Sequence, residues 1–124
     1  MHLASALAAT GLSSMGDLWP SELSPSTRRF VALARVLAAR PRVLLLDEVA
    51  AGFDGAERAA LAGCLRAVLA GGSGVLLVDH DLGLVAEMSD RVVVLDGGRI
   101  IANGPPGEVG SAEAVLAAYL GPKR

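Results

Sequence analysis

The sequence predicts an α/β fold in which helices flank a largely parallel β-sheet, with a β-hairpin and a helix closing the chain. Two runs of four consecutive apolar residues, 43–46 and 75–78, have the composition of strands that are buried on both faces. Residues 54–70, which lie between the two runs, have the spacing of a helix. A strand, helix and strand in this order predict two parallel strands joined by a crossover connection.

The C-terminal part of the sequence predicts the hairpin and the last helix. Apolar residues at 92–95 are followed by two adjacent glycines and a second strand at 99–102, which is typical of a tight β-turn. Residues 103–107 are expected to form a loop because they combine glycine and proline. Ser111 is expected to cap a helix that runs through Tyr119.

Two further helices are predicted before the first strand. Residues 2–12 have a helical pattern with Gly11 as a C-terminal stop. Residues 27–39 form an amphipathic pattern that Pro41 ends. Trp19, in the connection between the two helices, is interpreted as a packing residue.

Composition excludes several classes of protein. The chain of 124 residues is 52% hydrophobic but only 3% aromatic, so its core is aliphatic. A net charge of -2 argues against nucleic acid as a partner bound through bulk charge. Apolar runs of four residues are far shorter than the roughly 20 needed to span a bilayer. Cys64 is the only cysteine and is interpreted as packing, so the sequence favours a reducing, cytosolic compartment.

Acidic residues follow the first predicted strand, and a histidine follows the second. Asp47 and Glu48 come directly after the run 43–46, and Asp79-His80-Asp81 follows the run 75–78. Because the carboxyl ends of parallel strands meet at one edge of a sheet, these side chains are expected to lie close together. Carboxylates buried there are costly unless a cation or hydrogen bonds compensate, which suits Asp47 as a ligand of Mg²⁺. Glu48 could then orient or deprotonate a water, and His80 could donate to a phosphate oxygen.

Simpler interpretations exist for several of these residues. Asp47 alone could be a loop acid or a helix cap, and His80 alone an ordinary loop histidine. Asp54, with Glu57 three residues later, resembles a capping box, and Asp79 and Asp81 also fit caps or turns. Ser24 lies in Leu-Ser-Pro, a common start of a helix, so the residues themselves favour a cap there.

Four motifs in order resemble the second half of an ABC transporter ATPase subunit, a P-loop NTPase fold, over residues 20–105. They are the stretches Leu-Ser-Pro-Ser-Thr at 23–27, Leu-Leu-Leu-Asp-Glu at 44–48, Ala-Gly-Phe-Asp at 51–54 and Leu-Leu-Val-Asp-His at 76–80. Within that family the chain most resembles the ATP-binding subunits of branched-chain amino acid importers. The residues that point there are Ala-Ala-Gly at 50–52, the segment 99–104 and the closing segment 114–121.

The resemblance implies a role for each candidate residue. Asp47 would be the Walker B aspartate that binds Mg²⁺, and Glu48 the base that activates the attacking water. His80 would be the switch histidine on the γ-phosphate of ATP, and Asp54 the aspartate of the D-loop. Ser24 would be the signature serine, which contacts the nucleotide held by a second ATPase subunit in a head-to-tail dimer. Transmembrane permease subunits would hold such a protein at the inner face of the membrane, where ATP hydrolysis drives import.

The sequence departs from the family pattern in two ways. Pro25, Ser26 and Thr27 replace the usual Gly-Gly-Gln of the signature, and Val49 replaces a proline. No Gly-x-x-x-x-Gly-Lys-Ser/Thr pattern occurs and no glutamine loop, and the only lysine is Lys123. The chain therefore resembles a C-terminal portion of one ATPase domain, with 1–40 ending the helical subdomain and 41–124 forming the core. It is expected to be inactive alone.

Two alternatives belong to other classes of protein. One is the C-terminal lobe of a chromosome-maintenance ATPase, which also carries a signature, Walker B acids and a histidine. The other is a non-enzymatic partial domain that acts by interaction, because a half-domain leaves a sheet edge and an apolar face uncovered.

Overall fold

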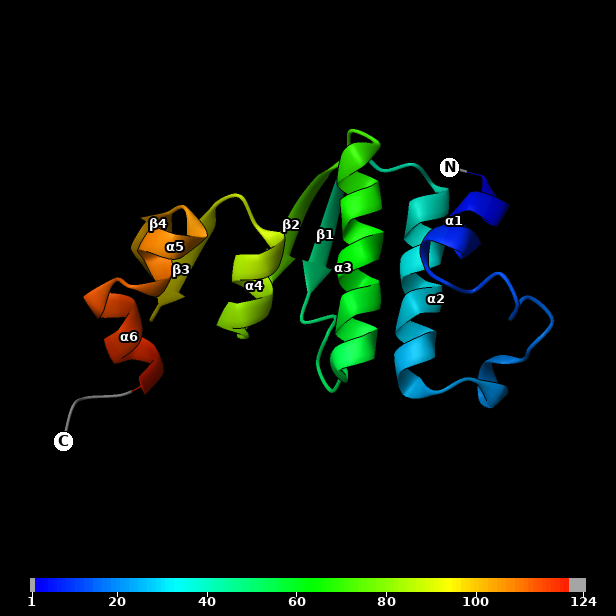
Figure 1. Cartoon of the computed structure of the whole chain (residues 1–124), viewed down its shortest axis with the longest axis horizontal. Coiled ribbons are helices and arrows are strands. Elements are labelled where there is room, and N and C mark those ends of the chain that lie inside the picture. Colours follow the sequence, from blue (N-terminus) through cyan, green and yellow to red (C-terminus); the bar gives the residue numbers. More distant parts are fainter. Residues whose placement is uncertain (1, 121–124) are drawn as a thin grey trace. The chain divides into compact units, whose positions relative to one another are not determined.

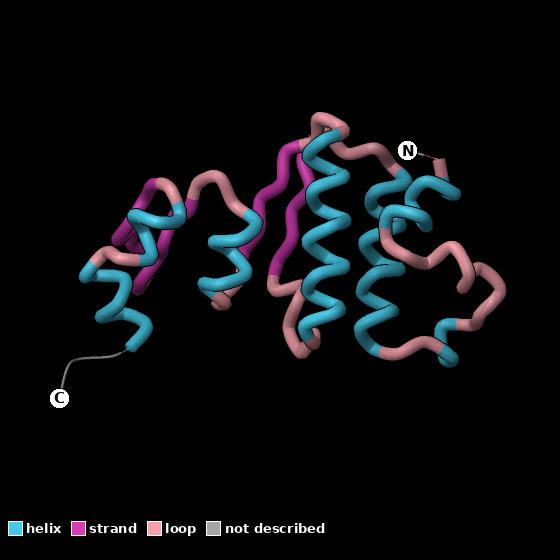
Figure 2. The backbone as a smooth tube through the Cα atoms, in the orientation of Figure 1, coloured by secondary structure: helices cyan, strands magenta, loops and turns pink. Residues whose placement is uncertain are grey.

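The computed structural model describes residues 2–120, with side chains described through Ala118 (Figure 1). The chain divides into two compact units, Met1–Leu77 and Val78–Arg124. Figure 2 shows the helices, strands and connections along the backbone. None of the helices within residues 2–120 combines the length and the apolar character needed to cross a bilayer.

The first unit contains the helices α1 (Leu3–Ala9), α2 (Pro25–Ala38) and α3 (Gly55–Ala70) and the short 3-10 helix η1 (Pro20–Glu22). Helix α1 packs against α2. The amphipathic pattern predicted for α2 is confirmed, since its buried residues are Phe30, Leu33, Ala34 and Leu37. In contrast, Trp19 is 74% exposed, so its interpretation as a packing residue is wrong. It lies in a polar connection, where its backbone N–H donates to Glu22 Oε2 at 2.6 Å.

Strands β1 (Val43–Asp47) and β2 (Gly74–Val78) are neighbours in one sheet. They run in the same direction in Figure 1, with α3 as the crossover between them. Two hydrogen bonds join their starting ends: Gly74 N–H donates to Arg42 O at 2.9 Å, and Ser73 Oγ donates to Pro41 O at 2.8 Å. The predicted α/β fold with parallel strands is therefore confirmed.

The prediction that β1 and β2 are buried on both faces is wrong for the residues that the structure describes. Leu44 and Leu46 are 2% and 7% exposed, whereas Leu45 is 70% exposed. Strand side chains alternate between faces, and the helices of the first unit pack on the face that holds Leu44 and Leu46. Strand β2 alternates less sharply, since Val75 and Leu77 are half-buried whereas Leu76 is 58% exposed. An apolar sheet thus has one face covered by helices and one face exposed.

The second unit contains α4 (Leu82–Met88), the strands β3 (Val92–Asp96) and β4 (Arg99–Gly104), and the helices α5 (Pro106–Gly110) and α6 (Glu113–Leu120). The predicted hairpin is confirmed, because β3 and β4 pair in antiparallel fashion. Gly97 and Gly98 form its turn with φ of +54° and +79°, values that favour glycine. The small core of this unit consists of Val92, Val94, Val109 and Val115.

Two expectations for the C-terminal segment are wrong. The helix α5 occupies part of the stretch expected to be a loop, with Pro106 at its first position, where a missing N–H costs nothing. Ser111 does not cap the helix that follows it. Its hydroxyl donates back to the carbonyls of Gly107 and Glu108, at 3.1 and 3.2 Å, and so closes α5 instead.

Candidate functional site

Asp47 and Glu48 lie at the carboxyl end of β1, where the sequence predicts them. Asp47 is the last residue of the strand, and both residues are exposed. The cost of burying an acid pair, which the sequence suggested as a reason for a bound cation, therefore does not apply to this structure. Exposed carboxylate oxygens at a strand end can still supply the hard ligands that Mg²⁺ prefers.

Glu48 has an unusual backbone conformation. Its φ is +49°, in the left-handed region that costs a non-glycine residue roughly 1–2 kcal/mol. The chain turns sharply at this residue, and Ala51 N–H donates back to Glu48 O at 3.4 Å. Strain of this kind persists where surrounding contacts fix the backbone, and it is enriched at functional sites.

Asp54 ends the loop that begins at Glu48 and caps α3. Its Oδ1 accepts from Glu57 N–H at 2.8 Å, so the predicted cap is confirmed. The carboxylate of Glu57 does not complete a capping box through Oε2, because that oxygen is buried without a hydrogen-bond partner. Gly52, at φ +76°, makes the second left-handed turn of the loop.

Ser24 is the N-cap of α2, as its residue type alone indicated. Its Oγ accepts from Thr27 N–H at 3.1 Å and lies 2.7 Å from Thr27 Oγ1 and 3.1 Å from Ser26 Oγ. Pro25 occupies the first helical position. The altered signature thus places three hydroxyl groups together at the exposed N-terminus of a 14-residue helix. Hydroxyls and N–H groups at such an end can bind a phosphate oxygen.

His80 belongs to the second unit, two residues after β2. Its side chain is 74% exposed, and Nδ1 lies 3.8 Å from Oδ1 of Asp79, whose side chain is only 4% exposed. Asp79 Oδ1 also accepts from Asp81 N–H at 2.9 Å, and Asp81 caps α4 by accepting from Leu84 N–H at 3.0 Å. The interpretation of Asp79 and Asp81 as turn and cap acids is confirmed. His80 presents its ring to solvent beside a buried carboxylate.

The structure brings some of the candidate residues together. Asp47 and Glu48 lie at the start of one short loop of the first unit, and Asp54 lies at its end. Ser24 starts a helix of the same unit. His80 lies in the other unit, so its expected meeting with Asp47 and Glu48 stays a prediction. Within residues 2–120, no three His, Cys, Asp or Glu side chains are placed to hold a metal ion together. A Mg²⁺ ion on Asp47 would take its other ligands from water and phosphate, as this ion commonly does.

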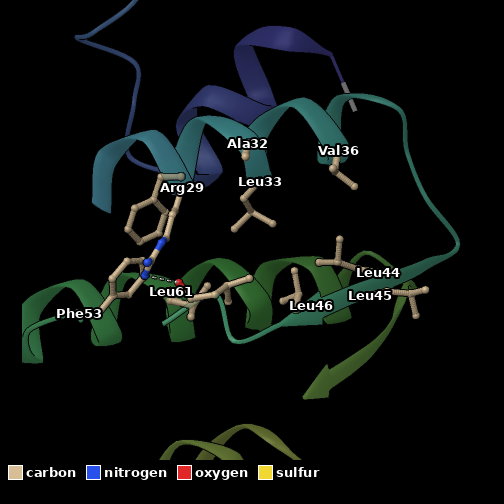
Figure 3. A pocket seen from close by; sticks show the side chains of 11 residues that line it. Arg29, Ala32, Leu33, Val36, Leu44, Leu45, Leu46, Phe53 and Leu61 are labelled. Atoms are coloured by element: carbon tan, nitrogen blue, oxygen red, sulfur yellow. Dashed lines mark hydrogen bonds between the residues drawn. The ribbon is translucent and has the colours of Figure 1, made fainter. Parts of the chain in front are cut away.

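No role is predicted for Arg29 from the sequence, but the structure places it against the loop after Glu48. A pocket of about 190 Å³ lies beside it, between α2, β1 and α3 (Figure 3). Neither Asp47 nor Glu48 lines this pocket, and its lining is mostly apolar. The pocket is therefore part of the packing around Leu44 and not a site for a charged nucleotide.

Solved structures with the same fold define the class of protein. An ATP-binding cassette of an ABC transporter, solved in its ADP conformation, superposes with a TM-score of 0.87 at 27% identity, covering 97% of this chain and 49% of that chain. The cbiO1 protein of Clostridium perfringens, part of the transporter complex cbiONQ, superposes with a TM-score of 0.80 at 32% identity, covering 92% and 45%. The chain therefore has the fold of part of an ABC ATPase domain.

Curated relatives agree with this class. The zinc import ATP-binding protein of Alkalilimnicola ehrlichii is 40% identical over 126 residues, covering 98% of this chain and 49% of the relative. An aliphatic sulfonates import ATP-binding protein of Agrobacterium fabrum is 44% identical over 97 residues, covering 77% and 38%. The cobalt import ATP-binding protein of Salmonella typhimurium is 42% identical over 87 residues, covering 70% and 32%. The homologues of this chain are thus ATP-binding subunits of ABC transporters.

The chain spans between 32% and 49% of the length of these three relatives. No model of a known protein family matches it.

Proposed function

We propose that this chain is the catalytic portion of an ATP-binding subunit of an ABC transporter, whose parent couples ATP hydrolysis to import of a small solute. The observation that carries the proposal is the match of nearly the whole chain to a solved ATP-binding cassette, with Asp47 and Glu48 at the end of β1. Relatives named as import proteins support the direction of transport. They also favour a transporter over a chromosome-maintenance ATPase or a non-enzymatic remnant.

The hydrolytic roles follow from side-chain chemistry and from the resemblance. When Mg²⁺ and ATP are bound, the ion neutralises charge that develops on the phosphate oxygens. Asp47 would supply an oxygen ligand to that ion, and Glu48 would accept a proton from the attacking water. His80 donates a hydrogen bond to the γ-phosphate, for which its exposed ring is suited.

Two further residues are assigned to the partner side of the site. Ser24 contacts the nucleotide of a second ATPase subunit in a head-to-tail dimer, through its hydroxyl and the N-terminus of α2. Pro25 replaces the first glycine of the usual signature, and Ser26 and Thr27 replace the second glycine and the glutamine. The hydroxyls of Ser26 and Thr27 lie within hydrogen-bond distance of Ser24. Asp54 takes the D-loop position in addition to its cap on α3.

The rest of the site is assigned to sequence beyond residues 1–124. The chain contains no phosphate-cradling Gly-x-x-x-x-Gly-Lys-Ser/Thr pattern, and its relatives are at least twice as long. In this proposal residues 1–40 belong to the helical subdomain, and 41–124 to the core. The exposed face of the β1–β2 sheet is then the face that the remaining part of the domain covers.

The transported solute is not carried over from the relatives, because they are named for aliphatic sulfonates, zinc and cobalt. The assignment to branched-chain amino acid import rests on the sequence of three segments, 50–52, 99–104 and 114–121. It stays a prediction. Transmembrane permease subunits are the expected partners, and they would hold the protein at the inner face of the membrane.

The proposal is tested by joining the chain to the part of a relative that it lacks. In a chimera, the chain replaces the segment that it matches in the zinc import relative, which is nearly half of that protein. We expect steady Mg-ATP hydrolysis by the chimera and none by the isolated chain. Steady hydrolysis by the isolated chain, abolished by Glu48→Gln, would show that no phosphate cradle from elsewhere is needed. An inactive chimera that still folds would contradict the catalytic assignment.

A further inference from the structure

Arg29 joins two parts of the first unit that are distant in sequence. It lies on α2, five residues after Ser24, and its Nη1 donates to the carbonyl oxygens of Val49 and Ala51. The Val49 contact measures 3.3 Å. Both acceptors belong to the loop that leaves Glu48 and ends at Asp54. One guanidinium group of α2 therefore binds two backbone carbonyls of this loop.

An aromatic pair supports the same contact. The guanidinium carbon of Arg29 lies 5.6 Å from the centre of the Phe53 ring, within the range of a cation–π interaction. Phe53 in turn stacks on Phe30, with ring centres 5.4 Å apart and planes 13° from parallel. Figure 3 shows Arg29 and Phe53 in contact, with the side chain of Arg29 extending from α2 to the loop. Both carbonyls accept from the same nitrogen, Nη1, which carries two N–H groups, while the guanidinium lies within cation–π range of the ring.

The loop needs such support because its backbone is strained. Glu48 and Gly52 both have positive φ, of +49° and +76°, and only Gly52 adopts it without a steric cost. Inside the loop, Ala51 N–H donates to Glu48 O at 3.4 Å and Phe53 N–H donates to Ala50 O at 3.0 Å. The first of these bonds is near the distance limit for a hydrogen bond, and the second has an ordinary length.

We propose that Arg29 is a positioning residue that fixes the backbone of the loop between Glu48 and Asp54, and so ties this loop to the helix that Ser24 begins. Through these hydrogen bonds, a movement of α2 would displace the backbone next to Glu48. Its consequence for hydrolysis rests on the role proposed above for Glu48. The tie itself rests only on contacts within the first unit.

The test measures amide hydrogen exchange by NMR in the full chain without nucleotide. In Arg29→Ala, we expect exchange of the Ala51 and Phe53 amides to rise about tenfold, as for loss of a charged hydrogen bond. The ¹³Cα shift of Glu48 should move away from its left-handed value. Amides in the middle of α3 should keep their rates. Arg29→Lys, which retains a positive charge and N–H donors on a shorter side chain without the planar guanidinium, should restore part of the protection.

The matched control is Arg28→Ala. Arg28 is the neighbouring exposed arginine on α2, and its Nε donates to the carbonyl oxygen of Pro20 in η1 at 2.9 Å. This variant removes the same charge and should leave the exchange of Ala51 and Phe53 unchanged. Equal loosening in both variants, a uniform rise throughout α2, β1 and α3, or no change at Ala51 would each overturn the proposal. Because no nucleotide is present, an inactive chimera would not affect this result.

Discussion

The two faces of the β1–β2 sheet have the same kind of side chain and opposite environments. On the inner face, Leu44 and Leu46 are 2% and 7% exposed, against the helices of the first unit. On the outer face, Leu45 is 70% exposed and Leu76 on β2 is 58% exposed. In Figure 3, Leu44 extends toward α2, whereas Leu45 points to the opposite side of the strand.

The difference shows what the sequence of a strand encodes. A strand with one solvated face normally alternates apolar and polar residues, whereas a strand covered on both faces is apolar throughout. Strand β1 is apolar throughout, as in a strand covered on both faces, but only one of its faces is covered in this structure. Its sequence thus fits a sheet with two layers of helices, as the proposed function requires of the complete domain.

The largest expected difference between the faces is in the free energy of unfolding. Leu44→Ala should cost about 3 kcal/mol, because it removes buried methyl groups and leaves a cavity beside the existing pocket. Leu45→Ala should cost no more than about 0.5 kcal/mol, since its side chain stays largely in water. Urea denaturation of the two variants measures both values. Equal costs would mean that the outer face is covered in solution.

Association of the chain should depend on the outer face. An exposed apolar sheet face with open strand edges favours contact between molecules. Leu45→Thr combined with Leu76→Thr should weaken self-association about tenfold, from the apolar area removed. Sedimentation velocity over a range of concentrations measures the change. A wild-type chain that stays monomeric at high concentration would contradict the expectation and count against a missing layer.

A smaller effect is expected at the start of α3, a helix that covers the inner face. Asp54 accepts a hydrogen bond from Glu57 N–H there, so Asp54→Ala should cost about 1 kcal/mol. Asp54→Asn keeps an acceptor at the cap and serves as the matched control, with a cost of a few tenths. Thermal unfolding of both variants provides the comparison. Identical midpoints for alanine and asparagine would show that the cap does not stabilise this helix.

A chemical comparison of the two faces uses Cys64, which lies on α3 and is 2% exposed. Burial raises the pKa of the Cys64 thiol. The unfolded thiol therefore loses its proton first as the pH rises, so this residue's contribution to stability is present below about pH 8.5 and is lost above it. Alkylation at pH 8 should be at least about 100-fold slower at Cys64 than at a cysteine placed on the outer face by Leu45→Cys, made together with Cys64→Ala. Similar rates would contradict the burial.

Local signals allowed much of the fold to be predicted. The strands, the glycine turn of the hairpin and the caps Asp54 and Asp81 each depend on a few neighbouring residues, and the structure confirms them. Two wrong predictions concern residue types that are common in more than one local structure. Pro106 begins a helix although the surrounding glycines and prolines predict a loop, and Ser111 closes one helix although serine also starts helices.

Features that depend on contacts across the sequence could not be predicted. The sequence shows that β1 is apolar on both sides but not whether the second cover lies within these residues. Arg29 reaches carbonyls 20 and 22 residues away, and no spacing rule indicates such a contact. The left-handed backbone of Glu48 is likewise a property of the folded loop, since glutamate has no preference for it.

The most direct test of the proposed function is hydrolysis of Mg-ATP by the chimera with the zinc import relative, compared between Glu48→Gln and Glu113→Gln. Glu113 is an exposed acid in the first turn of α6, with no role in the proposed site. We expect Glu48→Gln to retain ATP binding and to lower turnover by at least about 100-fold, as for loss of a general base. Glu113→Gln should keep the turnover of the unsubstituted chimera. Full turnover with Glu48→Gln would contradict the assignment of Glu48 as the residue that activates water.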